Sequence, residues 1–182
     1  MKNLFALFIV VFAWGFGAVE TFVITWNPEV CQDSCIAGLD VQFQRLVAVE
    51  NVQMDGRAGR ATLKWKKGKP FDFLAVNRAV QMIGVAINST RIEVSGTVRE
   101  ERSSVFLTSS PDGTRFELLN AVRPSLNEFR IEYSPYNRDL PMQLLKRLKE
   151  TADKKKVITV SGPLLLPERG SPYRLIVERI NW

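Results

Sequence analysis

Cys31 and Cys35 are the residues whose type and spacing suggest a specific chemistry, and they are the only cysteines in the sequence. Two thiolates four positions apart lie on one face if the segment is helical, or close together if Cys31 is still in the loop. In either case they can bind Cu(I) or supply half of a Zn(II) site. In an oxidising compartment the same pair can form a local disulfide. A disulfide, a metal site and unpaired thiols all stay open, whereas a thioredoxin-like oxidoreductase would need Cys-x-x-Cys.

Histidine is absent from all 182 residues. This absence removes Ser-His and Cys-His nucleophilic sites, His-ligated zinc and His proton shuttles. The composition, 46% apolar and 24% charged, is ordinary for a globular protein and argues against disorder. The formal net charge of +6 is modest and is typical of a lightly charged soluble surface. We expect a binding protein with no catalytic residues, not an enzyme.

Residues 1–18 have the pattern of a secretory signal peptide. A lysine at position 2 precedes the uncharged run LFALFIVVFAWGFGA, which ends in small residues. Fifteen residues are short for a bilayer span, which needs about 20. We therefore expect export to a periplasmic or extracellular compartment and no stable membrane span after cleavage.

Two apolar stripes with the same 3-4-3 spacing predict two helices between strand-like runs. The stripes are Ile36, Leu39, Phe43 and Leu46, and Phe73, Val76, Val80 and Ile83. The predicted strands are 21–26, 49–54, 58–65 and 90–98, with Asp55-Gly56 as a hairpin turn. The order β-α-β-β-α-β predicts a ferredoxin-like sandwich over residues 19–91, with both helices on one sheet face.

From about residue 92 the pattern changes to strands at 92–98, 105–109, 115–119, 157–165 and 173–180. One helix is expected before the last two strands, with Asp139 as its N-cap, Pro141 in its first turn, and one side lined by Met142, Leu145, Leu148 and Ala152. This order is that of a small OB-like β-barrel over residues 92–182. A Val-Ser-Gly triplet ends at Gly96 and again at Gly162, where glycine suits the bends that close a barrel. The fold class is thus α+β.

The first half resembles a known family on these residues. Strand, cysteine pair, helix, two strands, helix and strand over residues 20–96 are similar to a heavy-metal-associated domain, the module of copper chaperones and metal-transporting ATPases. Further matches are the valine-rich run 49–52, the strand 59–63 and Gly84 after the second helix. The resemblance implies Cys31 and Cys35 as ligands of Cu(I) or another soft metal ion. The family motif is Met-x-Cys-x-x-Cys, whereas here Glu29 takes the methionine position and three residues separate the cysteines.

The aromatic residues fall mostly on apolar positions of the predicted elements, so we expect core packing and not base stacking; they include Trp26, Trp65, Phe71, Phe73, Phe106, Phe116 and Phe129. The Lys64–Lys69 cluster is interpreted as a solvated turn. No nucleic acid is expected, while the OB-like half can dock a protein partner. The sequence predicts an exported non-enzymatic binding protein with a copper-type site on Cys31 and Cys35. The alternative is an envelope structural or protein-interaction protein whose two cysteines form a local disulfide.

Overall fold

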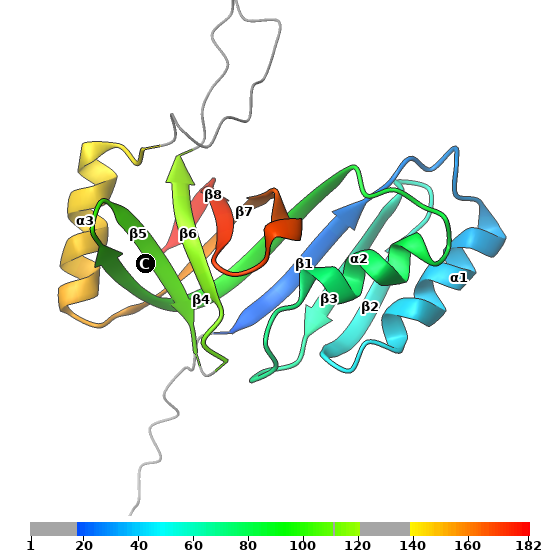
Figure 1. Cartoon of the computed structure of the whole chain (residues 1–182), viewed down its shortest axis with the longest axis horizontal. Helices are drawn as coiled ribbons and strands as arrows, with labels where there is room; N and C mark the ends of the chain where they lie inside the picture. The colour runs from blue at the N-terminus through cyan, green and yellow to red at the C-terminus, as the bar shows by residue number, and fades with distance from the viewer. Residues whose placement is uncertain (1–17, 111, 121–138) are drawn as a thin grey trace, which may run out of the picture.

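The computed structural model describes residues 18–110, 112–120 and 139–182, and its elements follow one another as in Figure 1. The described helices are α1 (Asp33–Gln44), α2 (Phe73–Gln81) and α3 (Met142–Asp153), with a 3-10 turn, η2 (Pro167–Arg169). The strands are β1 (Val19–Thr25), β2 (Val49–Asp55), β3 (Arg60–Trp65), β4 (Ser89–Glu101), β5 (Ser104–Ser109), β6 (Arg115–Asn120), β7 (Val157–Leu165), β8 (Tyr173–Val177) and β9 (Arg179–Asn181). In this described part of the chain, no helix has the length and apolarity needed to cross a membrane.

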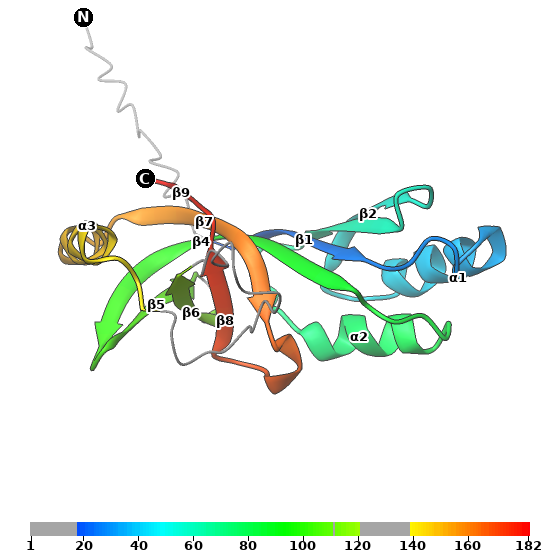
Figure 2. The ribbon, with the colours of Figure 1, turned by 90° about the horizontal axis from the view of Figure 1, so that it is seen from above.

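The N-terminal unit has the order β1-α1-β2-β3-α2 and leads into β4. Its strands pair antiparallel in the order β2-β3-β1-β4. Viewed from above, α1 and α2 lie on the same face of this sheet (Figure 2). Phe43 of α1 and Val80 of α2 are fully buried, because each helix has one apolar stripe to remove from water. The predicted helices and strands of this unit are confirmed to within a few residues at their ends.

The second half is a closed five-strand β-barrel of mixed pairing. Its strands follow the order β4-β5-β6-β8-β7, and β7 returns to pair with β4. The β6–β8 pair is parallel, and the other pairs of the barrel are antiparallel. Leu107, Phe116 and Leu175 are fully buried and fill the interior. Closure leaves these strands without the open edges that a flat sheet would have.

Strand β4 belongs to both sheets. Residues 89–94 pair with β1, residues 96–101 pair with β5, and residues 91–97 also pair with β7. The strand therefore continues through the predicted boundary between residues 91 and 92. The division into domains 19–91 and 92–182 stays a prediction.

Gly96 and Gly162 lie where the backbone of a neighbouring barrel strand occupies the space of a Cβ atom. A Cβ at Gly96 would overlap the carbonyl oxygen of Thr108 on β5, and one at Gly162 would overlap the carbonyl oxygen of Ile176 on β8. No side chain larger than hydrogen fits in either position without moving the backbone. The two Val-Ser-Gly triplets therefore mark positions where the barrel needs glycine.

Helix α3 begins later than the sequence predicts. Pro141 occupies the N-cap position with an extended ψ of 141°, and Asp139 lies before the helix with its side chain exposed. Proline suits this place because the first helical turn does not need its missing N–H. Met142 is 80% exposed instead of lining the apolar side, because it precedes the turns that pack on the barrel. Leu148, farther along α3, is fully buried as predicted.

The predicted strand from Tyr173 to Ile180 is two strands, β8 and β9. The interruption falls at Glu178, whose backbone N–H donates to the carbonyl of Ser161 at 3.1 Å. Before this point the chain pairs with both β6 and β7, and after it only with β7. The change of partner ends the regular strand.

Residues 1–17, which hold nearly all of the predicted signal peptide, lie outside the described residues, as do Pro111 and Phe129. Ala18 is described and buried, and its carbonyl accepts a hydrogen bond from the N–H of Ser95 at 2.9 Å. The described chain therefore begins in contact with β4.

Candidate functional site

Cys31 and Cys35 lie at disulfide distance from each other, with Cα atoms 5.2 Å apart. Cys31 lies in the loop between β1 and α1 and is only 1% exposed, packed into the hydrophobic core. Cys35 is half-buried in the first turn of α1. The predicted site residues are thus brought together, at a separation that allows a disulfide between the loop and the helix.

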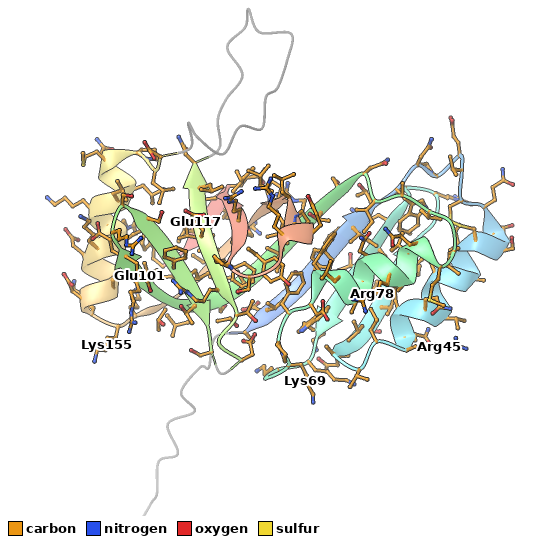
Figure 3. All side chains as sticks on the ribbon, in the orientation of Figure 1. Arg45, Lys69, Arg78, Glu101, Glu117 and Lys155 are labelled. Atoms are coloured by element: carbon orange, nitrogen blue, oxygen red, sulfur yellow. A yellow bond between two sulfur atoms is a disulfide. The ribbon has the colours of Figure 1, made fainter. Side chains whose placement is uncertain are left out.

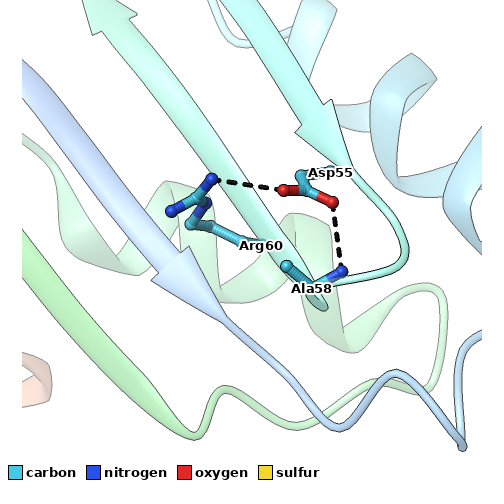
Figure 4. Close-up of polar contacts among 3 residues, drawn as sticks. All are labelled: Asp55, Ala58 and Arg60. Atoms are coloured by element: carbon cyan, nitrogen blue, oxygen red, sulfur yellow. Dashed lines mark hydrogen bonds and ion pairs between the residues drawn. The ribbon is translucent and has the colours of Figure 1, made fainter.

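The hairpin between β2 and β3 supports the loop that carries Cys31. Asp55 accepts a hydrogen bond from the N–H of Ala58 at 3.1 Å and pairs with Arg60 at 3.2 Å (Figure 4). Gly59 has a φ of +57° and its carbonyl accepts from the N–H of Trp26 at 2.8 Å. A Cβ at Gly59 would overlap the carbonyl oxygen of Trp26. The turn chemistry of Asp55-Gly56 therefore brings the hairpin against the start of the cysteine loop.

The acidic residues beside the cysteines, Glu29 and Asp33, are exposed. The backbone N–H of Glu29 donates to the Asn27 side chain at 3.0 Å, an Asx-type turn that shapes the loop. Among the described residues, no three or more of His, Cys, Asp and Glu are grouped so that they could hold a metal ion. Sulfurs that are bonded to each other are not thiolates, so a soft-metal site on this pair requires that the bond is first reduced.

Phe71, in the segment between β3 and α2, joins the two halves of the molecule. Its ring centroid lies 5.0 Å from Phe22, 5.2 Å from Trp65, 5.0 Å from Tyr173 and 6.2 Å from Phe116. The first two rings belong to the N-terminal sheet and the last two to the barrel. The sequence identifies Phe71 as a core residue, but its place where the core passes from the N-terminal sheet into the barrel depends on strand packing that no local pattern encodes.

The hydroxyl of Tyr173 strengthens this junction. It donates to the carbonyl of Phe71 at 3.2 Å and accepts from the N–H of Phe73 at 3.4 Å. Burial raises the pKa of Tyr173 above its ordinary value of 10.0, the N–H of Phe73 lowers the pKa, and the charge of Asp72 raises it. The net effect is a raised pKa, so the neutral phenol is the form that the fold stabilises.

The raised pKa predicts a loss of stability in alkali. Because the folded-state pKa lies above the unfolded value, the contribution of Tyr173 is fully present below about pH 10 and is lost as the pH rises through the folded-state pKa. Urea unfolding at pH 8 and again above pH 10 measures how far the free energy of unfolding falls between the two conditions. This fall should be smaller in Tyr173→Phe than in the unchanged protein. Parallel stability losses in the two proteins would contradict this assignment.

The Lys64–Lys69 cluster begins in the last two residues of β3 and continues into the turn after it, with its lysines engaged locally or solvated. Lys64 pairs with Glu50 at 3.2 Å, and the Lys66 ammonium donates to the carbonyl of Val47 at 2.9 Å. The indole N–H of the buried Trp65 donates to the carbonyl of Lys69 at 3.2 Å. Figure 3 shows the side chain of Lys69 directed away from the protein at the lower edge. Trp65 is therefore a core residue that fixes the turn, and no stacking platform forms there.

Most of the other aromatic residues for which the sequence predicts core packing are indeed buried. Those that are buried are Trp26, Phe71, Phe73 and Phe116. Phe106 differs, because it lies half-buried on the outer wall of the barrel under the guanidinium of Arg115, whose Cζ is 4.4 Å from the ring centroid. A cation over the ring occupies the face that a base would need.

Comparison with protein-family models, with curated proteins and with solved structures finds no match to this chain. The likeness to a heavy-metal-associated domain therefore rests on the residues quoted above, and the function has to be argued from the site.

Proposed function

We propose that the protein is an exported, non-enzymatic structural or protein-interaction protein of the cell envelope in which Cys31 and Cys35 form a local disulfide. The observation that carries this proposal is the position of the pair. Cys31 is buried in the core at disulfide distance from Cys35, which suits a structural link better than a thiol that must exchange a metal. The signal-like residues 1–18 support export, and an oxidising compartment keeps such a bond formed.

We further propose that the N-terminal unit is ferredoxin-like and that the barrel is of the OB type. The antiparallel order β2-β3-β1-β4 with two helices on one face supports the first assignment. The return of β7 to β4 and the parallel β6–β8 pair, with α3 inserted before β7, support the second. The fold by itself argues for no particular ligand.

A non-enzymatic role is supported by the absence of histidine from the sequence, because no imidazole is present to act as a general acid, a general base or the partner of a nucleophile.

The competing proposal is a copper-type site on the same two cysteines. It is favoured by one feature, the closeness of two soft sulfur donors at the start of a helix. It needs both thiols reduced and Cys31 brought out of the core. The two proposals therefore differ in the oxidation state that they assign to one pair of sulfurs.

The disulfide proposal predicts that the bond makes a measurable contribution to the free energy of unfolding. Chain-entropy arguments give about 2 kcal/mol for so short a loop, the low end for disulfides. Adding a thiol reductant should lower the free energy of unfolding by about this amount in the unchanged protein. Cys35→Ala should lose a similar amount, and in that variant the reductant should have no further effect. Urea unfolding with and without reductant measures both, and a reductant-insensitive stability of the unchanged protein would refute the structural role.

A further inference from the structure

We propose that a small pocket on the outer wall of the barrel binds a carboxylate group through Arg174 and Arg169. The pocket has a volume of about 190 Å³ and lies between Glu117 and Arg174 on the wall and the loop from Leu166 to Pro172. It lies on the barrel, whereas the cysteines precede α1, so this inference goes beyond the proposed function and does not depend on it.

Arg174 is the reason for expecting a ligand. The neighbours of Arg174 on β8, Tyr173 and Leu175, are buried in the core, so Arg174 lies on the outside of the wall. Its Nε is 3.6 Å from Oε2 of Glu117, too far for a hydrogen bond. Its Nη1 is buried and has no acceptor among the described residues. The side chain as a whole is 29% exposed and lines the pocket together with Arg169, so its positive charge is accessible to an anion there.

The charges around the pocket suit a single negative charge. Two guanidinium groups and one carboxylate give +2 − 1 = +1. Glu117 is held in place, because its Oε1 accepts from the Ser104 hydroxyl at 2.8 Å and its register partner across the parallel β6–β8 pair is Arg174. A doubly charged phosphate is repelled more strongly by this fixed carboxylate than a singly charged carboxylate is, and a carboxylate also matches the planar fork of arginine.

The loop over the pocket is built to hold its shape. Leu166 and Gly170 adopt φ values of 49° and 76°, and two short-range hydrogen bonds close the turn between them. The N–H of Arg169 donates to Leu166 at 3.2 Å, and that of Gly170 donates to Pro167 at 3.1 Å. Pockets for drug-sized ligands measure about 300–1,000 Å³, so this smaller space suits a carboxylate with few further atoms.

The experiment follows backbone amide signals of the full protein by NMR at constant ionic strength. The probes are acetate, a tetrapeptide with a free C-terminus, the same peptide amidated, and inorganic phosphate. Acetate and the free peptide should shift the Gly170 and Ser171 signals in a saturable way, and phosphate and the amidated peptide should not. Tighter binding of the peptide than of acetate assigns the ligand as a peptide C-terminus, and equal binding assigns it as a small organic acid.

Three substitutions localise the binding. Arg174→Gln should weaken it about tenfold or more, and Arg169→Gln should weaken it less while leaving the fold intact, because that side chain is exposed. Arg179→Gln removes an equal charge from exposed β9 and should change nothing. If Arg174→Gln does not fold, the comparison of Arg169→Gln with Arg179→Gln decides. Absence of any saturable shift, equal weakening by Arg169→Gln and Arg179→Gln, or phosphate binding as tightly as acetate would overturn the proposal.

Discussion

Replacing Phe71 by alanine is expected to lower the free energy of unfolding by about 3–5 kcal/mol, the usual range when a packed core phenylalanine is truncated to alanine. Phe71 is 4% exposed and contacts aromatic rings of both the N-terminal sheet and the barrel. Its removal therefore leaves a cavity at the junction, and the rings of both halves lose contacts. Urea unfolding followed by tryptophan fluorescence and by circular dichroism measures the loss.

Phe106→Ala is the matched control for Phe71→Ala. It removes the same ring from the outer wall of the barrel, where Phe106 is half-buried and the Arg115 guanidinium covers its face. We expect a loss of about 1 kcal/mol, because little apolar area returns to water. Equal losses for the two variants would mean that Phe71 does not hold the two halves together.

Gly162→Ala is expected to destabilise the barrel by about 3 kcal/mol or more, at or above the upper range for overpacking. The added methyl group would overlap the carbonyl oxygen of Ile176, a backbone atom that cannot turn aside. Either β7 or β8 must shift, which disturbs the pairing that brings β7 back to β4. Thermal and urea unfolding should both show the loss.

Gly113→Ala separates this steric effect from the ordinary cost of replacing a glycine. Gly113 has a φ of +73° and open space around its Cβ position. Alanine there should cost about 1–2 kcal/mol, through backbone conformation alone. A loss at Gly162 no greater than at Gly113 would show that the strands can separate without cost.

Much of the secondary structure could be predicted because its causes are local. The 3-4-3 stripes from Ile36 to Leu46 and from Phe73 to Ile83 predict α1 and α2, since a helix on a sheet must be apolar along one side. The glycines at 96 and 162 were identified from a repeated triplet, and both lie at close strand contacts. The closeness of Cys31 and Cys35 also follows from their spacing, although spacing alone leaves their oxidation state open.

The remaining features depend on contacts between distant parts of the chain. Glu117 and Arg174 become neighbours only through the parallel β6–β8 pair, so no sequence window contains both. The start of α3 depends on which of its turns pack on the barrel. Met142, expected on the apolar side of the helix, precedes those turns and is exposed. Phe71 is recognisable as apolar, but its contacts with rings of both the N-terminal sheet and the barrel follow only from the tertiary packing of the two halves. Alternation and helical periodicity describe which side is buried, not what it is buried against.

The central claim, that Cys31 and Cys35 form a structural disulfide, is tested most directly by the intact mass of the protein isolated from its native compartment with free thiols blocked. The account predicts a chain lighter than its reduced form by the mass of two hydrogen atoms, with no blocking group on either sulfur. Copper titration of the reduced protein accompanies this measurement. Blocked thiols on the native protein, together with about one Cu(I) bound per reduced chain and lost on Cys→Ser at either position, would contradict the claim and favour the metal site.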